Sequence, residues 1–171
     1  PIPGLFLPQI HAPSTGNEIV SAANRVLGSC PPPSGKSIKM LKRFVTELAD
    51  SLDAPRPLTL EEALLTFRGP KYKLYSRALE SLRARPLEKH DSSIKAFIKA
   101  EKFDPLAKRN PDPRMIQCRG ERFNLHMACY TKPLEKALYG LRDHTGTEVF
   151  AKCANSYRKA ELIKTKFDSV P

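Results

Sequence analysis

Apolar side chains recur at helical spacing along much of the chain, and the clearest run covers residues 36–52. Six apolar positions fall there on one helical face, with charged side chains opposite: Ile38, Leu41, Phe44, Val45, Leu48 and Leu52. Spacing of this kind is typical of an amphipathic α-helix that packs its apolar face against a core. We therefore predict a core-packing helix over 36–52.

Capping signals predict two short helices. Residues 17–28 combine apolar periodicity with Asn17, whose side chain can accept a hydrogen bond from a backbone N–H of the first turn. Further along, Thr59 and Glu62 have the spacing of a capping box, in which each side chain bonds the backbone N–H of the other residue. This pair predicts a helix that ends near Phe67.

Longer helices are predicted in three other stretches. One starts at Pro70, because proline is favoured in the first helical turn, and runs to about Arg85. Its expected buried stripe is Tyr72, Tyr75, Leu79 and Leu82. A helix or helix pair over 123–141 should bend near Pro133, and a last helix is expected over 148–167. The inward positions of that last helix are Val149, Cys153, Tyr157, Ala160 and Ile163.

Strand character is weaker and occurs in two short stretches. Residues 94–99 alternate as a strand does, and 114–118 are the expected partner. The proline-rich stretch between them, 102–113, is expected to be a loop. Residues 1–16 contain four prolines and show no periodicity, so we expect an extended N-terminal arm. The fold class that follows is α+β and mostly helical.

The charge balance points to an anionic partner. The chain carries 29 lysines and arginines against 18 aspartates and glutamates, a formal net charge of +11. Such a protein binds polyanions favourably, because each cation that neutralises a phosphate releases a counterion. The alternative is a soluble basic domain with no particular partner. Apolar runs are only a few residues long, far short of the roughly 20 that a transmembrane helix needs.

The four cysteines do not form a C-x-x-C pair. Cys118, His126 and Cys129 come nearest to a metal-binding set, since the last two are three residues apart on a predicted helix. A structural zinc site requires closely paired thiolates or imidazoles. We therefore interpret Cys118 and Cys129 as reduced, half-buried cysteines and expect no metal ligands in this chain.

Basic side chains converge on the two predicted strands and their flanks. They are Lys95, Lys99, Lys102, Arg114, Arg119 and Arg122. Arginine offers a planar fork for phosphate oxygens and lysine a mobile point charge, so such a hairpin suits a triphosphate or a nucleic-acid backbone. The alternative is a solvated strand edge whose charge is balanced by neighbouring acids. Those acids are Glu101, Asp112 and Glu121.

The same stretch resembles a known motif. F-I-K-A-E-K at 97–102 is followed by P-D-P-R-M-I-Q-C-R-G-E-R-F-N at 111–124 and by Y-T-K-P-L-E at 130–135. This arrangement is similar to motif F of the tombusvirus-like (carmovirus-type) RNA-dependent RNA polymerases of positive-strand RNA viruses. F-R-G-x-K-Y-x-x-Y at 67–75 also resembles that family, as do the Asn- and Arg-bearing helix near residue 24 and the final helix. The resemblance covers about 17–167; it is strong over 94–140 and weak elsewhere.

This resemblance implies the fingers portion of a right-hand viral RNA polymerase, with the two strands as a basic motif F β-hairpin. In that family, motif F roofs the channel through which nucleoside triphosphates enter. Carried onto this sequence, Lys102 and Arg122 are the leading candidates for binding the triphosphate. Lys99, Arg114 and Arg119 are second candidates, for the triphosphate or for the template backbone.

The resemblance also implies Mg²⁺ ions held by palm aspartates outside this chain, because an Asp-x4-Asp element and a Gly-Asp-Asp turn are both absent from the sequence. We therefore expect an arm over 1–16 and a fingers segment over 17–171 that stops before the palm motifs and is inactive alone. The expected partners are the RNA template and nascent strand, nucleoside triphosphates, and the palm and thumb of the same polymerase. The expected location is the host cytoplasm, at membrane-associated replication sites.

A stand-alone basic RNA-binding viral accessory protein, without catalysis, is the alternative function. The reading frame beyond Pro171 separates the two hypotheses. An aspartate motif shortly after that residue supports the polymerase, whereas a stop codon supports the binding protein.

Overall fold

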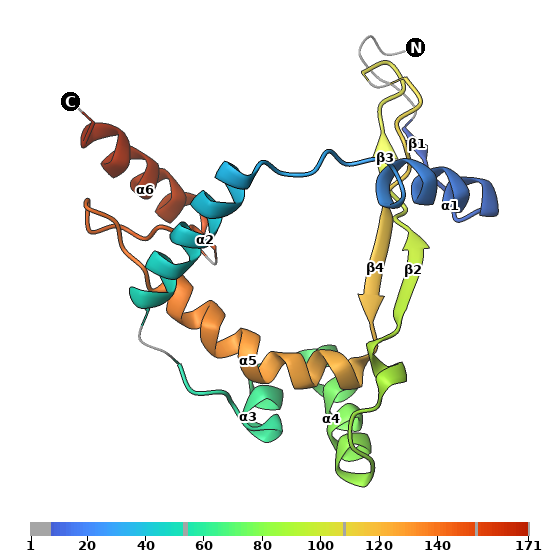
Figure 1. Cartoon of the computed structure of the whole chain (residues 1–171), viewed down its shortest axis with the longest axis horizontal. Helices are drawn as coiled ribbons and strands as arrows, with labels where there is room; N and C mark the ends of the chain where they lie inside the picture. The colour runs from blue at the N-terminus through green and yellow to red at the C-terminus, as the bar shows by residue number, and fades with distance from the viewer. Residues whose placement is uncertain (1–7, 53–54, 108, 153, 171) are drawn as a thin grey trace. The chain divides into compact units, whose positions relative to one another are not determined.

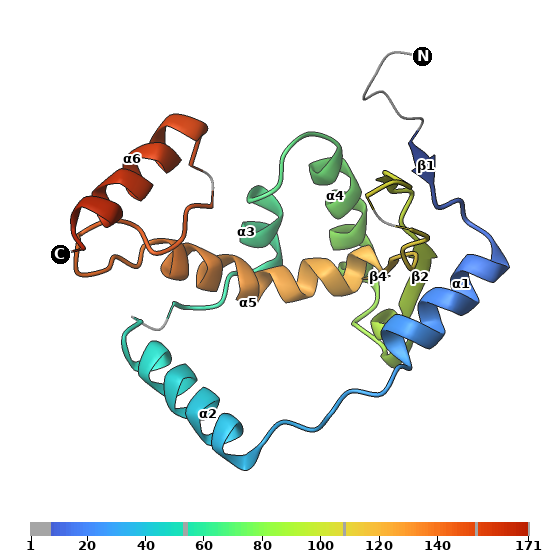
Figure 2. The ribbon, with the colours of Figure 1, turned by 90° about the horizontal axis from the view of Figure 1, so that it is seen from above.

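The described residues divide into two compact units, each built from two stretches of chain that are far apart in sequence (Figures 1 and 2). The computed structural model describes residues 8–52, 55–107, 109–152 and 154–170. The first unit combines the described parts of Pro1–Pro33 and Glu88–Gly120, and the second those of Ser34–Leu87 and Glu121–Pro171. Helices account for most of the regular structure, in agreement with the predicted mostly helical α+β class.

The first unit contains short helical segments and all four named strands of the described chain. In chain order they are β1 (Gln9–Ile10), α1 (Thr15–Ser21), the π-helical segment η1 (Ala22–Val26), the 3-10 segment η2 (Lys89–Ser92), β2 (Ile94–Ile98), β3 (Lys102–Phe103) and β4 (Met115–Arg119). The prediction that Asn17 is the N-cap of this helix is wrong. Ser14 is the N-cap, because its hydroxyl accepts the hydrogen bond from the Asn17 backbone N–H at 3.2 Å. The Asn17 side chain instead donates to the Ala12 carbonyl at 2.8 Å.

Two separate antiparallel pairs form the strand structure of this unit. β2 pairs with β4 in a register that runs from Ile94 opposite Arg119 to Ile98 opposite Met115, which confirms the predicted pairing of these two strands. β1 pairs with β3, so a two-residue strand occurs within the stretch predicted to be a loop. The predicted arm contains β1 and the start of α1, while its residues 1–7 lie outside the described residues.

The second unit is helical. Its helices are α2 (Gly35–Asp50), α3 (Leu60–Leu65), α4 (Gly69–Ala84), α5 (Glu121–Tyr139) and α6 (Ser156–Asp168). The predicted capping box at Thr59 and Glu62 is present in full and begins α3. Among the described residues, no helix is both long and apolar enough to cross a lipid bilayer.

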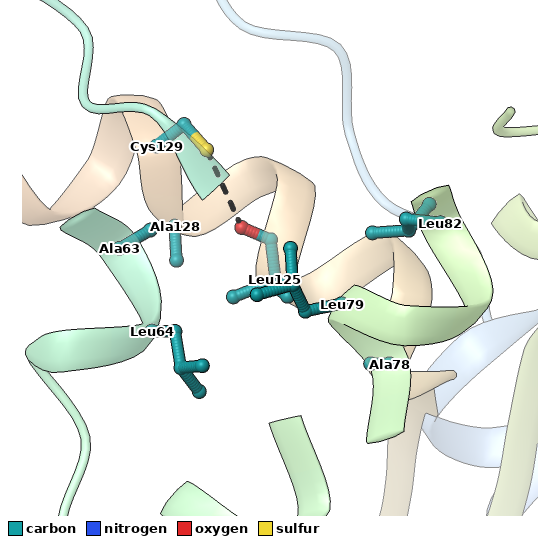
Figure 3. Close-up of a cluster of buried hydrophobic side chains, with 8 residues drawn as sticks. All are labelled: Ala63, Leu64, Ala78, Leu79, Leu82, Leu125, Ala128 and Cys129. Carbon is teal, nitrogen blue, oxygen red and sulfur yellow. Dashed lines mark hydrogen bonds between the residues drawn. The ribbon is translucent and has the colours of Figure 1, made fainter. Parts of the chain in front are cut away.

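The core of the second unit lies where α3, α4 and α5 meet (Figure 3). Small and branched side chains from all three helices interlock there: Ala63, Leu64, Ala78, Leu79, Leu82, Leu125, Ala128 and Cys129. Of the stripe predicted on α4, Leu79 and Leu82 are buried and Tyr75 is half-buried, but Tyr72 is exposed. Tyr72 lies in the first turn of α4.

Pro133 lies inside α5, which continues as one helix to Tyr139 and is not divided into a helix pair. Proline has no backbone N–H, so the carbonyl four residues earlier loses its helical partner. That carbonyl belongs to Cys129, and the Leu58 backbone N–H donates to it at 2.8 Å. The break in the α5 ladder therefore provides an attachment point for the chain leading into α3.

The prediction that α2 packs its apolar face into a core is wrong for the described chain. The helix is present with Ser34 as its N-cap, but none of its residues is buried, and Leu41 and Phe44 are 62% and 60% exposed. Periodicity determines which side chains share a face, whereas burial requires a partner surface. The core of this unit is formed by other helices.

The last helix begins later than predicted. The Asn155 side chain caps α6 by accepting a hydrogen bond from the Arg158 backbone N–H at 2.9 Å, which sets the helix start at Ser156. Leu162 is the buried residue of α6, whereas Tyr157 and Ile163, both predicted to face inward, are exposed. Val149, also predicted to face inward, lies before the helix and is half exposed, and Cys153 lies outside the described residues.

Candidate nucleic-acid interface

The β2–β4 ladder brings two of the predicted cations together. Beyond the last residue of β2, the Lys99 backbone N–H donates to the Arg114 carbonyl at 2.8 Å, so these two residues lie opposite each other at one end of the ladder. Side chains alternate between the faces of a strand. Lys95, Lys99 and Arg114 therefore share one face, which confirms that Lys95 and Lys99 lie on the same side.

Glu101 links the two cations at this end. Its carboxylate accepts a hydrogen bond from Arg114 Nε at 2.6 Å, pairs with Arg114 Nη2 as well, and lies 3.3 Å from Lys99 Nζ. The predicted balancing role of this acid is thus observed at Lys99 and Arg114. Because these side chains are about half exposed, the pairs contribute only about 0–1 kcal/mol each and chiefly orient the guanidinium.

Lys102 is the first residue of β3, with an exposed side chain. It lines a cavity of about 490 Å³ that lies entirely within the first unit. The other residues lining this cavity are His11, Arg25, Glu101, Phe103, Asp104, Ala107, Pro111, Asp112 and Arg114. The cavity therefore brings Lys102 and Arg114 to one opening, together with Arg25, which was not among the predicted site residues.

Arg119 lies at the opposite end of the ladder, paired with Ile94. It lies five positions beyond Arg114, which corresponds to about 17 Å along an antiparallel strand. The odd number of steps also places its side chain on the other face. Arg119 and Arg114 are therefore too far apart along the strand to bind the same phosphate group.

Arg122 belongs to the second unit and has a different environment. From the first turn of α5, its guanidinium donates to Ser81 Oγ at 2.7 Å and to the carbonyls of Arg85 and Pro86 at 3.0 and 2.8 Å. The last carbonyls of a helix have no partner within the helix. Arg122 thus supplies hydrogen-bond donors at the C-terminal end of α4. The other four predicted site residues, Lys99, Lys102, Arg114 and Arg119, belong to the first unit.

Contacts from the N-terminal segment hold the loop between β2 and β4, and sequence reasoning missed them. Asn24 Nδ2 donates to Asp112 Oδ1, and Arg25 Nη2 donates to the Asp112 carbonyl, both at 3.0 Å. The His11 ring stacks on Phe103 with 4.6 Å between centroids. Periodicity and motif spacing carry no information on a contact between residues almost 90 positions apart. The resemblance to the polymerase family covered the helix that carries Asn24, but it did not indicate which residue Asn24 contacts.

The three residues considered as a metal-binding set belong to two different units. Cys118 is exposed on β4 in the first unit, whereas His126 and Cys129 lie on α5 in the second. Burial raises the pKa of the Cys129 thiol. Within the described ranges, no three His, Cys, Asp or Glu side chains lie together as metal ligands would. Glu101 and Asp112, the acids beside the loop cations, accept hydrogen bonds from Arg114 and Asn24.

Comparison with known proteins gives one consistent result. A family model described as viral RNA-dependent RNA polymerase matches residues 15–170. The chain is 37% identical over 114 residues to the RNA-directed RNA polymerase of Maize chlorotic mottle virus, covering 66% of this chain and 12% of that protein. It is 45% identical over 112 residues to the corresponding protein of Groundnut rosette virus, covering 65% and 13%.

A third relative extends the similarity along the chain. The RNA-directed RNA polymerase of Tobacco necrosis virus (strain D) is 32% identical over 140 residues, covering 81% of this chain and 19% of that protein. No solved structure matches. The chain thus spans less than a fifth of the length of these three relatives.

Proposed function

Because the chain belongs to the viral RNA-dependent RNA polymerase family, we propose that it forms part of the fingers of an RNA-directed RNA polymerase and grips the incoming nucleoside triphosphate and the template RNA. The observation that carries this proposal is the grouping of Lys99, Lys102 and Arg114 at one end of the β2–β4 ladder. These residues belong to the stretch that resembles motif F. The reaction of the complete protein would be nucleotidyl transfer in viral RNA replication.

Lys102 and Arg114 are the proposed triphosphate ligands of the first unit. Both line the cavity beside the loop, and Lys102 is exposed. Glu101 holds Arg114 and Lys99 only weakly, so an incoming phosphate can take over these cations at small cost. Arg119, at the other end and on the other face of the ladder, is proposed to bind the template backbone.

Arg122 remains a predicted triphosphate ligand, but its hydrogen bonds set a condition. Its guanidinium has to leave Ser81 and the carbonyls of Arg85 and Pro86 in order to bind a phosphate. Each of these is a hydrogen bond from a charged donor, worth about 1.5–3 kcal/mol. Lys102 has no such contacts to give up among the described residues, which favours it as the first ligand.

The chemistry explains why cations are needed at this place. Nucleotidyl transfer releases pyrophosphate, so negative charge builds up on the leaving group, and cations already in position stabilise that charge. Mg²⁺, bound by aspartates elsewhere in the polymerase, would supply further neutralisation of the triphosphate. Within this chain, the proposed work of Lys99, Lys102 and Arg114 is to bind and orient the phosphates.

Other proposed partners follow from the same assignment. They are the nascent RNA strand and the palm and thumb of the polymerase, against which the exposed apolar faces of α2 and α6 can pack. The host cytoplasm, at membrane-associated replication sites, remains the predicted location. A stand-alone RNA-binding accessory protein is not favoured, because the polymerase family model covers nearly the whole chain.

The test is to replace Lys102 with alanine in a complete polymerase that contains this chain. Loss of a charged phosphate contact is expected to raise the nucleotide KM about tenfold while the Kd for template RNA changes little. Lys89→Ala, which removes an exposed lysine of the same unit outside the loop, is the matched control and should leave both values unchanged. A weakened template affinity at constant nucleotide KM would reverse the assigned roles.

A further inference from the structure

The loop that carries Lys102 and leads to Arg114 is attached to the N-terminal segment at two places. Near its start, β3 pairs with β1 and Phe103 stacks on His11. Near its end, Asp112 receives one hydrogen bond on its side chain and one on its carbonyl. We call this second attachment, formed by Asn24, Arg25 and Asp112, the Asp112 anchor.

The Asp112 anchor acts on a stiff part of the chain. Asp112 lies between Pro111 and Pro113, and proline fixes its own φ angle and restricts the residue before it to extended conformations. Pro113 is buried as well. Asp112 therefore cannot shift without moving Arg114, two residues further along. The anchor holds both the side chain and the backbone of Asp112. It therefore fixes the position of Asp112 and the direction in which the chain enters β4.

We infer that Asn24 and Arg25 are positioning residues for nucleotide binding: through Asp112 they aim Arg114 at the cavity that it shares with Lys102. The inference rests on the proposed function of these two cations. Arg25 lines the same cavity, but its guanidinium is directed to the Asp112 carbonyl. Asn24 is uncharged and is not among the residues that line the cavity, so it can influence a bound phosphate only through the loop.

This difference between Asn24 and Arg25 separates positioning from direct contact. Asn24→Leu keeps the size of the side chain and removes the donor without changing any charge. Arg25→Ala removes the second hydrogen bond, and Arg25→Lys keeps the charge and one donor. Lys89→Ala again serves as the control for loss of a surface charge in this unit. All four variants are made in the complete polymerase.

The measurements are nucleotide KM and kcat, template Kd, and hydrogen exchange of the backbone amides of 102–114. Arg25→Ala and Asn24→Leu should raise the nucleotide KM, by up to about tenfold for Arg25→Ala, with a smaller effect on kcat and none on template Kd. Amide exchange in the loop should accelerate in both variants because local opening becomes easier. The nucleotide KM of Arg25→Lys should lie between the values of Arg25→Ala and the wild type. The nucleotide KM of Lys89→Ala should equal that of the wild type.

Three outcomes overturn the inference. One is a nucleotide KM in both variants equal to that of Lys89→Ala. Another is a raised KM in Arg25→Ala alone with loop exchange unchanged, which would make Arg25 a direct ligand. The third is faster loop exchange with no change in KM. Lys102→Ala distinguishes failure of the proposed function: if it raises the KM while the anchor variants do not, only the positioning role fails.

Discussion

Arg114 and Arg122 carry the same guanidinium group in two different settings. Arg114 is paired with the partly exposed carboxylate of Glu101, an ion pair that we expect a phosphate to replace. Arg122 donates to a hydroxyl and two carbonyls at the end of α4, neutral acceptors that would lose their partner if it left. On the proposed function, we therefore expect that removing Arg114 weakens nucleotide binding, whereas removing Arg122 weakens the packing of α4 against α5.

A carboxylate at the start of α3 makes the stability of the second unit sensitive to acid. Hydrogen bonds from Arg56, and then from the Thr59 backbone N–H, lower the pKa of Glu62 from 4.5 to about 2. A lowered folded-state pKa stabilises the protein above the unfolded value, and this stabilisation is lost as the pH falls through the folded value. We expect thermal stability to fall between pH 4.5 and about 2.

Glu62→Gln is the variant that tests this dependence. Glutamine does not ionise, so the variant should be less stable than the wild type at pH 7 and should lose less stability on acidification. Melting temperatures of both proteins across this pH range measure the effect. Two parallel curves would show that Glu62 does not contribute to the acid sensitivity.

At the scale of elements, the α3–α4–α5 core carries the second unit, and Leu125 is at its centre with no exposed surface. Leu125→Ala removes buried methyl groups and leaves a cavity, which should lower the free energy of unfolding by about 2–5 kcal/mol. Leu65→Ala is the matched control, because Leu65 lies on α3 but is 66% exposed. Denaturant unfolding measures both. Equal losses in the two variants would contradict the assigned core.

Local signals in the sequence predicted the elements whose cause is local. The capping box of α3, the start of α4 near Pro70 and the pairing of β2 with β4 were all predictable, because each depends on neighbouring residues or on strand alternation. The exposed face of α2 and the β1–β3 pair were not, because they depend on surfaces far along the chain or outside it. In the candidate site, the cations were found from their charges, whereas the Asp112 anchor that holds their loop was not.

At the scale of the whole molecule, the chain combines a net charge of +11 with apolar helix faces that the described residues leave exposed. Phe44 on α2 and Tyr157 and Phe167 on α6 are between 60% and 84% exposed. Both features suit the proposed function, in which the cations would meet RNA and nucleotides and the apolar faces would meet other domains. The central claim is that the loop between β2 and β4 touches the triphosphate of the incoming nucleotide.

The most direct measurement of that claim is photo-crosslinking in a complete polymerase that contains this chain. A nucleoside triphosphate with a photoreactive group on its γ-phosphate is bound with template RNA, irradiated, and the modified peptides are identified by mass spectrometry. Adducts within 99–114 that disappear on competition with unmodified nucleotide are the predicted result. Competable adducts that lie only in other parts of the polymerase, with none in this loop, would contradict the account.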